Sequence, residues 1–329
     1  MKIASVEKIL EVYPHPNADS LEFVKVLGYQ CIVKKEMFKA GDLVVFIQPD
    51  TMLPDHDTQE WAKKYLNGNG RRVKARMFRK EWSFGIVEPI SILPPFETYT
   101  EGEEIADLID VTKYEPPAPK DVQAKGNLPF GVGKTDEERY QNLKMEDYFG
   151  KEVDITLKID GQSCSFYYDL ETDVFGVMGR SYELKPEIHN NYTAHIERYG
   201  LKDKLKQYCV DNGVSLILRG ESYGSSIQKF KHNPHAKGEH GWACFSVWVV
   251  NTKKYARKGD QHYFRDVCAK IGVPSVPVIE SGVILTPELV TKYDTDLKVI
   301  NGNQFEGVVV QTSEDSFKII NKWYDEKKE

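Results

Sequence analysis

The feature that most constrains the fold is a change in the hydrophobic pattern near residue 112. Before that point, short runs rich in β-branched residues alternate with turn signals such as His-Pro-Asn-Ala-Asp at 15–19. The runs cover residues 6–12, 21–28, 30–35 and 42–49. Short strands joined by tight turns favour a small antiparallel barrel, because closure removes exposed strand edges. We therefore expect residues 1–112 to form an all-β domain.

The pattern after this domain changes twice. Residues 113–134 are rich in Pro, Gly and Lys, which is typical of linkers, and we place the linker at 113–138. From residue 139, strand and helix patterns are mixed, which favours an α+β domain with antiparallel-rich sheets over 139–329. Its expected strands are 152–161, 163–169, 214–221, 243–250, 305–312 and 316–320, and its expected helices are 192–211, 262–272 and 286–293.

Composition excludes several classes of protein. The 329 residues are 40% hydrophobic and 12% aromatic, enough for a real core and against wholesale disorder. A mean hydropathy of -0.49 leaves no run near the roughly 18 apolar residues that a membrane helix requires. Glu7, Lys8 and Glu11 interrupt the region where a signal peptide is apolar, and the five scattered cysteines form no CxxC pair. We expect an intracellular protein without membrane segments, disulfides or a zinc site.

The net charge of -6 argues against a uniformly basic nucleic-acid-binding protein, although local patches steer partners. The densest basic segment is residues 71–80, and aromatic residues interleave with its cations from Arg76 to Phe84. On a strand, such alternation directs charges toward phosphates and rings toward the core or toward bases. A solvated strand face is the alternative interpretation of this segment alone.

In the second half, polar residues lie at the ends of expected strands. Lys158 ends an apolar run and is followed by Asp160 and Gly161. A lysine there suits a nucleophile if desolvation or a nearby cation lowers its pKa, because only the neutral amine attacks. The alternative is an ordinary lysine at a hairpin turn.

Three further signals follow the same rule. Glu221 after the 214–221 run could bind a ribose hydroxyl or metal-bound water, or form a surface ion pair. Phe245 could stack on a base or belong to the core. Glu306, with Lys318 twelve residues later (318 − 306), suits a site for a metal and a phosphate.

Taken in order, these segments resemble the motif series of covalent nucleotidyltransferases, the superfamily of polynucleotide ligases and mRNA capping enzymes. The resemblance spans about residues 139–322. It rests on Lys158-x-Asp160-Gly161, Gly179-Arg180-Ser181, Arg219-Gly220-Glu221, Phe245, Glu306-Gly-Val-Val-Val and Lys318.

The resemblance implies a role for each of these positions. Lys158 would attack the α-phosphate of ATP and form a lysyl-AMP adduct. The metal ion, Mg²⁺ or Mn²⁺, would be held largely through its waters by Asp160, Glu221 and Glu306. The nucleotide would contact Lys158, Arg180, Glu221, Phe245, Glu306 and Lys318, with Phe245 on adenine and Lys318 at the α-phosphate. One departure is Ser316, where many members carry the first lysine of a Lys-x-Lys motif.

The N-terminal domain adds a second resemblance. Residues 6–29 look like the tRNA-binding type of OB-fold, and residues 76–89 are similar to its closing part. An OB-fold in front of a ligase domain resembles the RNA ligases typified by the Naegleria and Deinococcus enzymes. Residues 135–142 also resemble the leading segment of RNA ligase domains.

These resemblances imply an ATP-dependent RNA ligase that seals 3′-OH and 5′-phosphate ends, at nicks in duplex RNA, with no obligate protein partner. The expected RNA-binding residues are Arg72, Lys74, Arg76, Arg79 and Lys80. Two alternatives stay open: a GTP-using enzyme of the capping type, and a non-catalytic RNA-binding protein.

Overall fold

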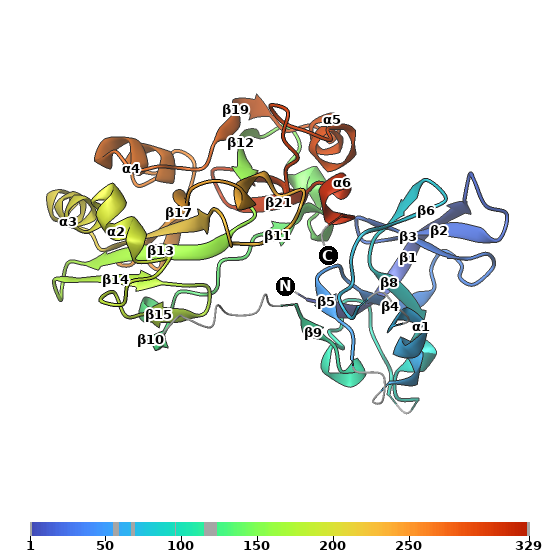
Figure 1. Cartoon of the computed structure of the whole chain (residues 1–329). Coiled ribbons are helices and arrows are strands. Elements are labelled where there is room, and N and C mark those ends of the chain that lie inside the picture. Colours follow the sequence, from blue (N-terminus) through green and yellow to red (C-terminus); the bar gives the residue numbers. More distant parts are fainter. Residues whose placement is uncertain (1, 55–58, 67–69, 96, 115–123, 328–329) are drawn as a thin grey trace. The chain divides into compact units, whose positions relative to one another are not determined.

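The computed structural model describes residues 2–54, 59–66, 70–95, 97–114 and 124–327. Its contacts divide the chain into two compact units (Figure 1). The first contains Met1–Pro117 and Tyr140–Met145, and the second contains Ala118–Arg139 and Glu146–Glu329. The described residues from 124 to 138, which we expected in the linker, form strands and turns of the second unit, and residues 140–145 return to the first.

The first unit is built on an antiparallel sheet with the strand order β3-β2-β1-β4-β8. Its long strand β1 pairs with both β2 and β4, and a register shift between Ile9 and Glu11 bends it between the two partners. The strands are β1 (Ala4–Pro14), β2 (Leu21–Val26), β3 (Tyr29–Lys34), β4 (Leu43–Ile47) and β8 (Ile86–Pro89). The backbone N–H of Phe84, just before β8, donates to Gln30 O of β3 at 2.9 Å and so holds this segment against β3. The antiparallel sheet confirms the predicted β architecture of the N-terminal part of the chain.

Smaller elements complete this unit. Strand β5 (Thr51–Met52) pairs with β9 (Thr112–Lys113), and β6 (Arg76–Phe78) forms a hairpin with β7 (Glu81–Ser83). Its only α-helix among the described residues is the short α1 (Lys63–Leu66). The core lies between the sheet and these elements and is lined by Val6, Val45, Ile47, Leu53, Ile105 and Ile109.

The second unit contains two sheets. The larger has the order β10-β15-β14-β13-β16-β17-β18, with every neighbouring pair antiparallel. Its strands are β10 (Ala124–Asn127), β13 (Gln162–Asp169), β14 (Val174–Met178), β15 (Tyr182–Leu184), β16 (Leu216–Tyr223), β17 (Gly241–Val249) and β18 (Lys254–Ala256). The smaller has the order β11-β21-β20-β12-β19, in which only the pair β11–β21 is parallel. Its strands are β11 (Glu138–Arg139), β12 (Glu152–Lys158), β19 (Val278–Ile284), β20 (Gly307–Gln311) and β21 (Ser316–Ile320).

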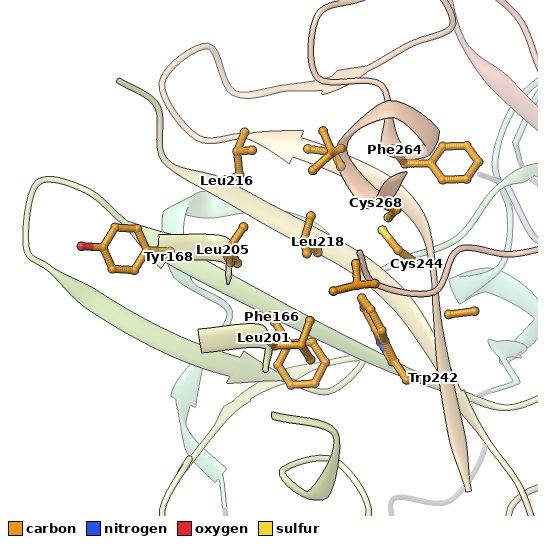
Figure 2. Close-up of a cluster of buried hydrophobic side chains, with 14 of the residues drawn as sticks. Phe166, Tyr168, Leu201, Leu205, Leu216, Leu218, Trp242, Cys244, Phe264 and Cys268 are labelled. Carbon is orange, nitrogen blue, oxygen red and sulfur yellow. The ribbon is translucent and has the colours of Figure 1, made fainter. Parts of the chain in front are cut away.

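Helices cover one face of the larger sheet. Figure 2 shows Leu201 and Leu205 of α3 near Leu218, and Cys268 of α4 next to Cys244 of the sheet, within one apolar cluster that also contains Phe264 and Trp242. The helix expected over 192–211 is two helices, because Gly200 adopts a left-handed φ of 62° and ends the first. The helices are α2 (Ala194–Tyr199), α3 (Leu201–Asn212), α4 (Phe264–Ile271), α5 (Pro287–Thr291) and α6 (Lys322–Asp325).

The predicted α+β architecture with antiparallel-rich sheets is confirmed. Within the described part of the chain, no helix has the length and apolar character needed to cross a membrane.

Candidate active site

Lys158 is the last residue of β12, where it pairs with Gly307 of β20. Its Nζ lies 2.6 Å from Oε2 of Glu306, the residue just before β20. The turn that follows requires glycine at position 161, because a Cβ there would lie 2.3 Å from Ser222 O. Strand pairing therefore fixes the lysine and the glutamate side by side at one end of the smaller sheet.

Glu221 joins this pair from β16 of the larger sheet, where it lies opposite Ser163. Burial raises the pKa of Glu221 to about 8; Lys158 acts against this rise, and the charges of Glu306 and Asp160 add to it. The four residues therefore interact electrostatically across the two sheets. In this group Lys158 is paired with Glu306.

Asp160 is buried and held by two residues that our sequence analysis did not identify. Tyr324 of α6 donates its hydroxyl to Asp160 Oδ2 at 2.7 Å. Asn233 donates its amide to the backbone oxygen of Asp160 at 2.8 Å. All three side chains are at most 5% exposed. The Tyr324 contact fixes the direction of the carboxylate, and the Asn233 contact holds the backbone that carries it.

Two predicted phosphate-binding cations meet at one acid. Lys318 Nζ lies 2.9 Å from Asp136 Oδ1, and Arg180 Nη2 lies 3.8 Å from Asp136 Oδ2. Lys318 pairs with Val309, which in turn pairs with Thr156. Since directly paired residues share a face and side chains alternate along a strand, Lys318 and Lys158 lie on the same face of the smaller sheet.

Phe245 occupies a β-bulge of β17. Arg219 pairs with Ser246 and Gly220 pairs with Cys244, so Phe245 is the extra residue between the two pairs. Its side chain packs against the core cluster but is only partly buried. A bulge changes the direction of a side chain, and this one gives Phe245 an orientation that simple alternation would not.

The carboxylates of Asp160, Glu221 and Glu306 are the expected ligands of a divalent cation. Among the residues that the structure describes, no three His, Cys, Asp or Glu side chains are close enough to hold an ion directly. Burial is the main cause of the raised pKa of Glu221, and the charges of Glu306 and Asp160 add to it, so the three acids lie near one another. This arrangement fits a divalent cation held mainly through its water shell, as Mg²⁺ prefers.

The five predicted RNA-binding residues lie in different surroundings. Arg72 forms an ion pair with Asp50, and its guanidinium carbon lies 4.3 Å from the ring centre of Tyr114. Arg76 is in β6, and Arg79 and Lys80 form the exposed turn of the β6–β7 hairpin. Lys74 is partly buried in the segment before the hairpin. Of these five residues, Arg79 and Lys80 of the hairpin turn are the exposed ones.

The fold and these clustered side chains define a nucleotidyltransferase domain that follows an antiparallel β domain in the sequence. The RNA ligase family matches residues 151–324, which include Lys158, Glu221 and Glu306. A second family, described as an OB-fold domain, matches residues 3–90. The chain belongs to the RNA ligase family, and the predicted ligase domain with an OB-fold in front of it is confirmed.

Solved structures of the Naegleria gruberi RNA ligase are similar to this chain over nearly its whole length. A glutamate-to-alanine variant with ATP and Mn has 25% identity and a TM-score of 0.84, covering 99% of each chain. The enzyme with PPi has 25% identity and a TM-score of 0.83, covering 98% of each chain. A lysine-to-methionine variant with AMP and Mn has 24% identity and a TM-score of 0.84, covering 99% of each chain. No curated protein sequence matches this chain.

Proposed function

We propose that this member of the RNA ligase family joins RNA 3′-OH and 5′-phosphate ends with ATP, through a lysyl-AMP intermediate at Lys158. The observation that carries the proposal is the 2.6 Å contact between Lys158 Nζ and Glu306 in a site shared with Asp160 and Glu221. The similar Naegleria enzyme was solved with ATP, AMP, PPi and Mn, which supports these ligands here.

The first step is attack by the neutral amine of Lys158 on the α-phosphorus of ATP. A nitrogen–phosphorus bond forms, the bond from the α-phosphorus to the bridging oxygen breaks, and pyrophosphate leaves with the electron pair. The ammonium proton must leave Nζ first, and Glu306 Oε2 already accepts a hydrogen bond from that atom. Glu306 thus orients the nucleophile before the nucleotide binds.

The remaining residues position the nucleotide and neutralise its charge. Lys318 faces the α-phosphate as negative charge develops, Arg180 contacts the ribose or the incoming 5′-phosphate, and Phe245 stacks on adenine. In the second step AMP passes from Lys158 to the RNA 5′-phosphate. In the third, the 3′-OH attacks that phosphate, and AMP leaves as the phosphodiester forms.

A divalent cation, Mg²⁺ or Mn²⁺, would be held by Asp160, Glu221 and Glu306, and it would neutralise phosphate charge and favour an unprotonated amine. Tyr324 holds the Asp160 carboxylate and Asn233 holds the Asp160 backbone, so this carboxylate is oriented by contacts within the protein.

For the RNA, we propose a duplex with a nick, contacted by Arg76, Arg79 and Lys80 of the hairpin, with Lys74 beside them. These cations belong to the first unit, while the nucleotide site belongs to the second. We accordingly assign RNA binding to an OB-fold domain at 1–112 and nucleotidyl transfer to the domain that follows the 113–138 segment.

The test is incubation with Mg²⁺ and ATP labelled at the α-phosphate, followed by a denaturing gel. The wild type should keep the label and Lys158→Ala should lose it completely, because no other group replaces the amine. Lys151→Ala is the matched control, since Lys151 lies just before the opposite end of β12 and pairs with Glu314. Pretreatment with pyrophosphate removes AMP that the protein already carries.

Other results would select the alternatives. Label from GTP but not from ATP would indicate the capping type of enzyme. No label from either nucleotide would contradict the proposal and favour a non-catalytic RNA-binding protein. Nicked RNA and DNA duplexes, compared with single-stranded ends, would then test the proposed substrate.

A further inference from the structure

Ser316 stands where the resemblance to covalent nucleotidyltransferases leads us to expect the first lysine of a Lys-x-Lys motif. It is the first residue of β21, two residues before Lys318, and pairs with Gln311, which pairs with Asp154. By strand alternation, Ser316, Lys318 and Lys158 share one face of the smaller sheet. Where a lysine at position 316 would place an ammonium group on this face, the chain has the short, uncharged hydroxyl side chain of serine.

A cation that follows a strand of the larger sheet contacts the Ser316 side chain. Arg257 follows β18 of the larger sheet, and its Nη1 donates to Ser316 Oγ at 2.6 Å. Ser316 Oγ in turn donates to Glu137 Oε2 at 2.8 Å. The Arg257 backbone N–H donates to Asp260 at 2.7 Å, and its guanidinium lies 5.2 Å from the ring centre of Tyr255. These contacts hold the Arg257 guanidinium beside the Ser316 hydroxyl.

The position of this charge suits the leaving group of the first step. Lys158 pairs with Gly307, and Gly307 pairs with Ile320, so Lys318 and Ser316 lie one and two alternate positions farther along β21. Each such step is about 6.5–7 Å. In an in-line displacement the leaving oxygen departs on the side opposite the attacking amine. Pyrophosphate would therefore leave along the direction from Lys158 past Lys318 toward Ser316.

We propose that Arg257 supplies the positive charge that Ser316 lacks and binds the β- and γ-phosphates of ATP. The proposal rests on the proposed function and adds a phosphate-binding residue to it. Arginine is suited to this task because its planar guanidinium stays charged and binds phosphate oxygens in pairs. When the α-phosphorus bonds to Lys158, the electron pair leaves with pyrophosphate, and Arg257 neutralises that charge together with Lys318.

In the ligand-free protein, two acids just before β11 interact with the cluster that contains Lys318 and Arg257. Asp136 contacts Lys318, and Glu137 shares Ser316 with Arg257. The charges of both Arg257 and Lys318 act on the Glu137 carboxyl, which places the two cations in one electrostatic cluster. The phosphates would compete with these carboxylates for the same positive charges.

The experiment compares Arg257→Ala with the wild type in two reactions. Formation of lysyl-AMP from ATP should slow by about 100-fold at fixed Mg²⁺, as loss of one donor to a developing oxyanion does. Joining of chemically pre-adenylylated RNA needs no β- or γ-phosphate and should change less than about twofold by the same reasoning. The double variant Arg257→Ala/Ser316→Lys should recover adenylylation, because it returns a cation to the same face, and Arg257→Lys should be intermediate.

Lys254→Ala is the control, because Lys254 is an exposed cation of β18. Titration with inorganic pyrophosphate and Mg²⁺, compared with AMP, gives a readout apart from catalysis: Arg257→Ala should weaken pyrophosphate binding and spare AMP. Equal losses in adenylylation and joining, or unchanged pyrophosphate binding, would overturn the proposal. If the wild type forms no lysyl-AMP, the proposed function fails, and the pyrophosphate titration still decides the role of Arg257.

Discussion

At the scale of single residues, Asp154 shows how a buried charge can be held beside a reactive strand. It lies on β12 four residues before Lys158 and is 2% exposed. Lys258 and Arg265 contact its carboxylate at 3.0 and 2.8 Å. Ser281 Oγ and the Gly282 N–H each donate to it at 2.9 Å. One carboxylate thus joins β12 to α4, to β19 and to the turn after β18.

We predict that Asp154→Asn destabilises the second unit by about 3 kcal/mol, because it leaves two cations without their buried partner. Although burial raises the pKa of Asp154, hydrogen bonds from Lys258, Gly282 and Ser281 lower it to about 2. A folded-state pKa below the unfolded value of about 4 stabilises the protein above pH 4, and this contribution disappears as pH falls toward 2. Thermal unfolding between pH 7 and pH 2 would measure it.

The variant and the wild type should therefore differ most at neutral pH and converge in acid. Asp173→Asn is the control, because Asp173 pairs with Lys206 at the surface, and its melting temperature should hardly change. A constant difference between Asp154→Asn and the wild type from pH 7 to pH 2 would show that the charge of Asp154 is not the cause.

At the scale of elements, the β6–β7 hairpin carries a strained turn. Its two turn residues, Arg79 and Lys80, both have left-handed φ angles, 50° and 72°. Two-residue hairpin turns of this kind normally contain Asn or Gly, since a side chain makes left-handed backbone unfavourable. The neighbouring Phe78 is 43% exposed. Strained backbone that presents exposed cations and a ring is characteristic of a binding element.

We predict that Arg79→Asn/Lys80→Gly stabilises the first unit by about 1 kcal/mol while weakening RNA binding. Two fewer phosphate contacts should reduce the slope of log K against log salt by about 2. Glu36→Gly relieves another left-handed residue, φ 62°, without removing a cation, so it should stabilise without altering RNA binding. Unchanged affinity of the double variant over a salt series would exclude the hairpin from the RNA contact.

At the scale of the whole molecule, the sequence predicted the positions of strands and motifs along the chain but not the contacts between distant segments. The strands that carry Lys158 and Lys318, and the strand that begins just after Glu306, lie close to their expected ranges. The pairing of β20 with β21 follows from the short connection between them, whereas the Lys158–Glu306 contact spans 148 residues. The contacts of Asp160 with Asn233 and Tyr324 span 73 and 164 residues. No local pattern encodes such long-range contacts. Arg257 was missed for the same reason, because only folding brings it to Ser316.

The same limit applies to the path of the chain. Composition predicted a linker, yet the chain passes from the first unit to the second, returns at Tyr140–Met145, and leaves again. The returning segment is held by Gly28, whose N–H donates to Gln141 O at 2.9 Å, and by Asn142, which donates to Gln48 at 2.9 Å. Gln141 is 4% exposed. The segment is therefore part of the packed structure of the first unit.

We predict that Gly28→Ala releases this segment. A Cβ at position 28 would lie 2.7 Å from Gln141 O and 2.8 Å from Gln141 Cα, and backbone atoms cannot move aside as a flexible side chain can. The cost should be about 2 kcal/mol, as for other overpacked positions. Hydrogen exchange of the amides at 140–145 should accelerate. Gly126→Ala, where a Cβ meets nothing within 4 Å, should leave it unchanged. If exchange at 140–145 stays as slow in Gly28→Ala as in the wild type, the segment is held by contacts other than Gly28.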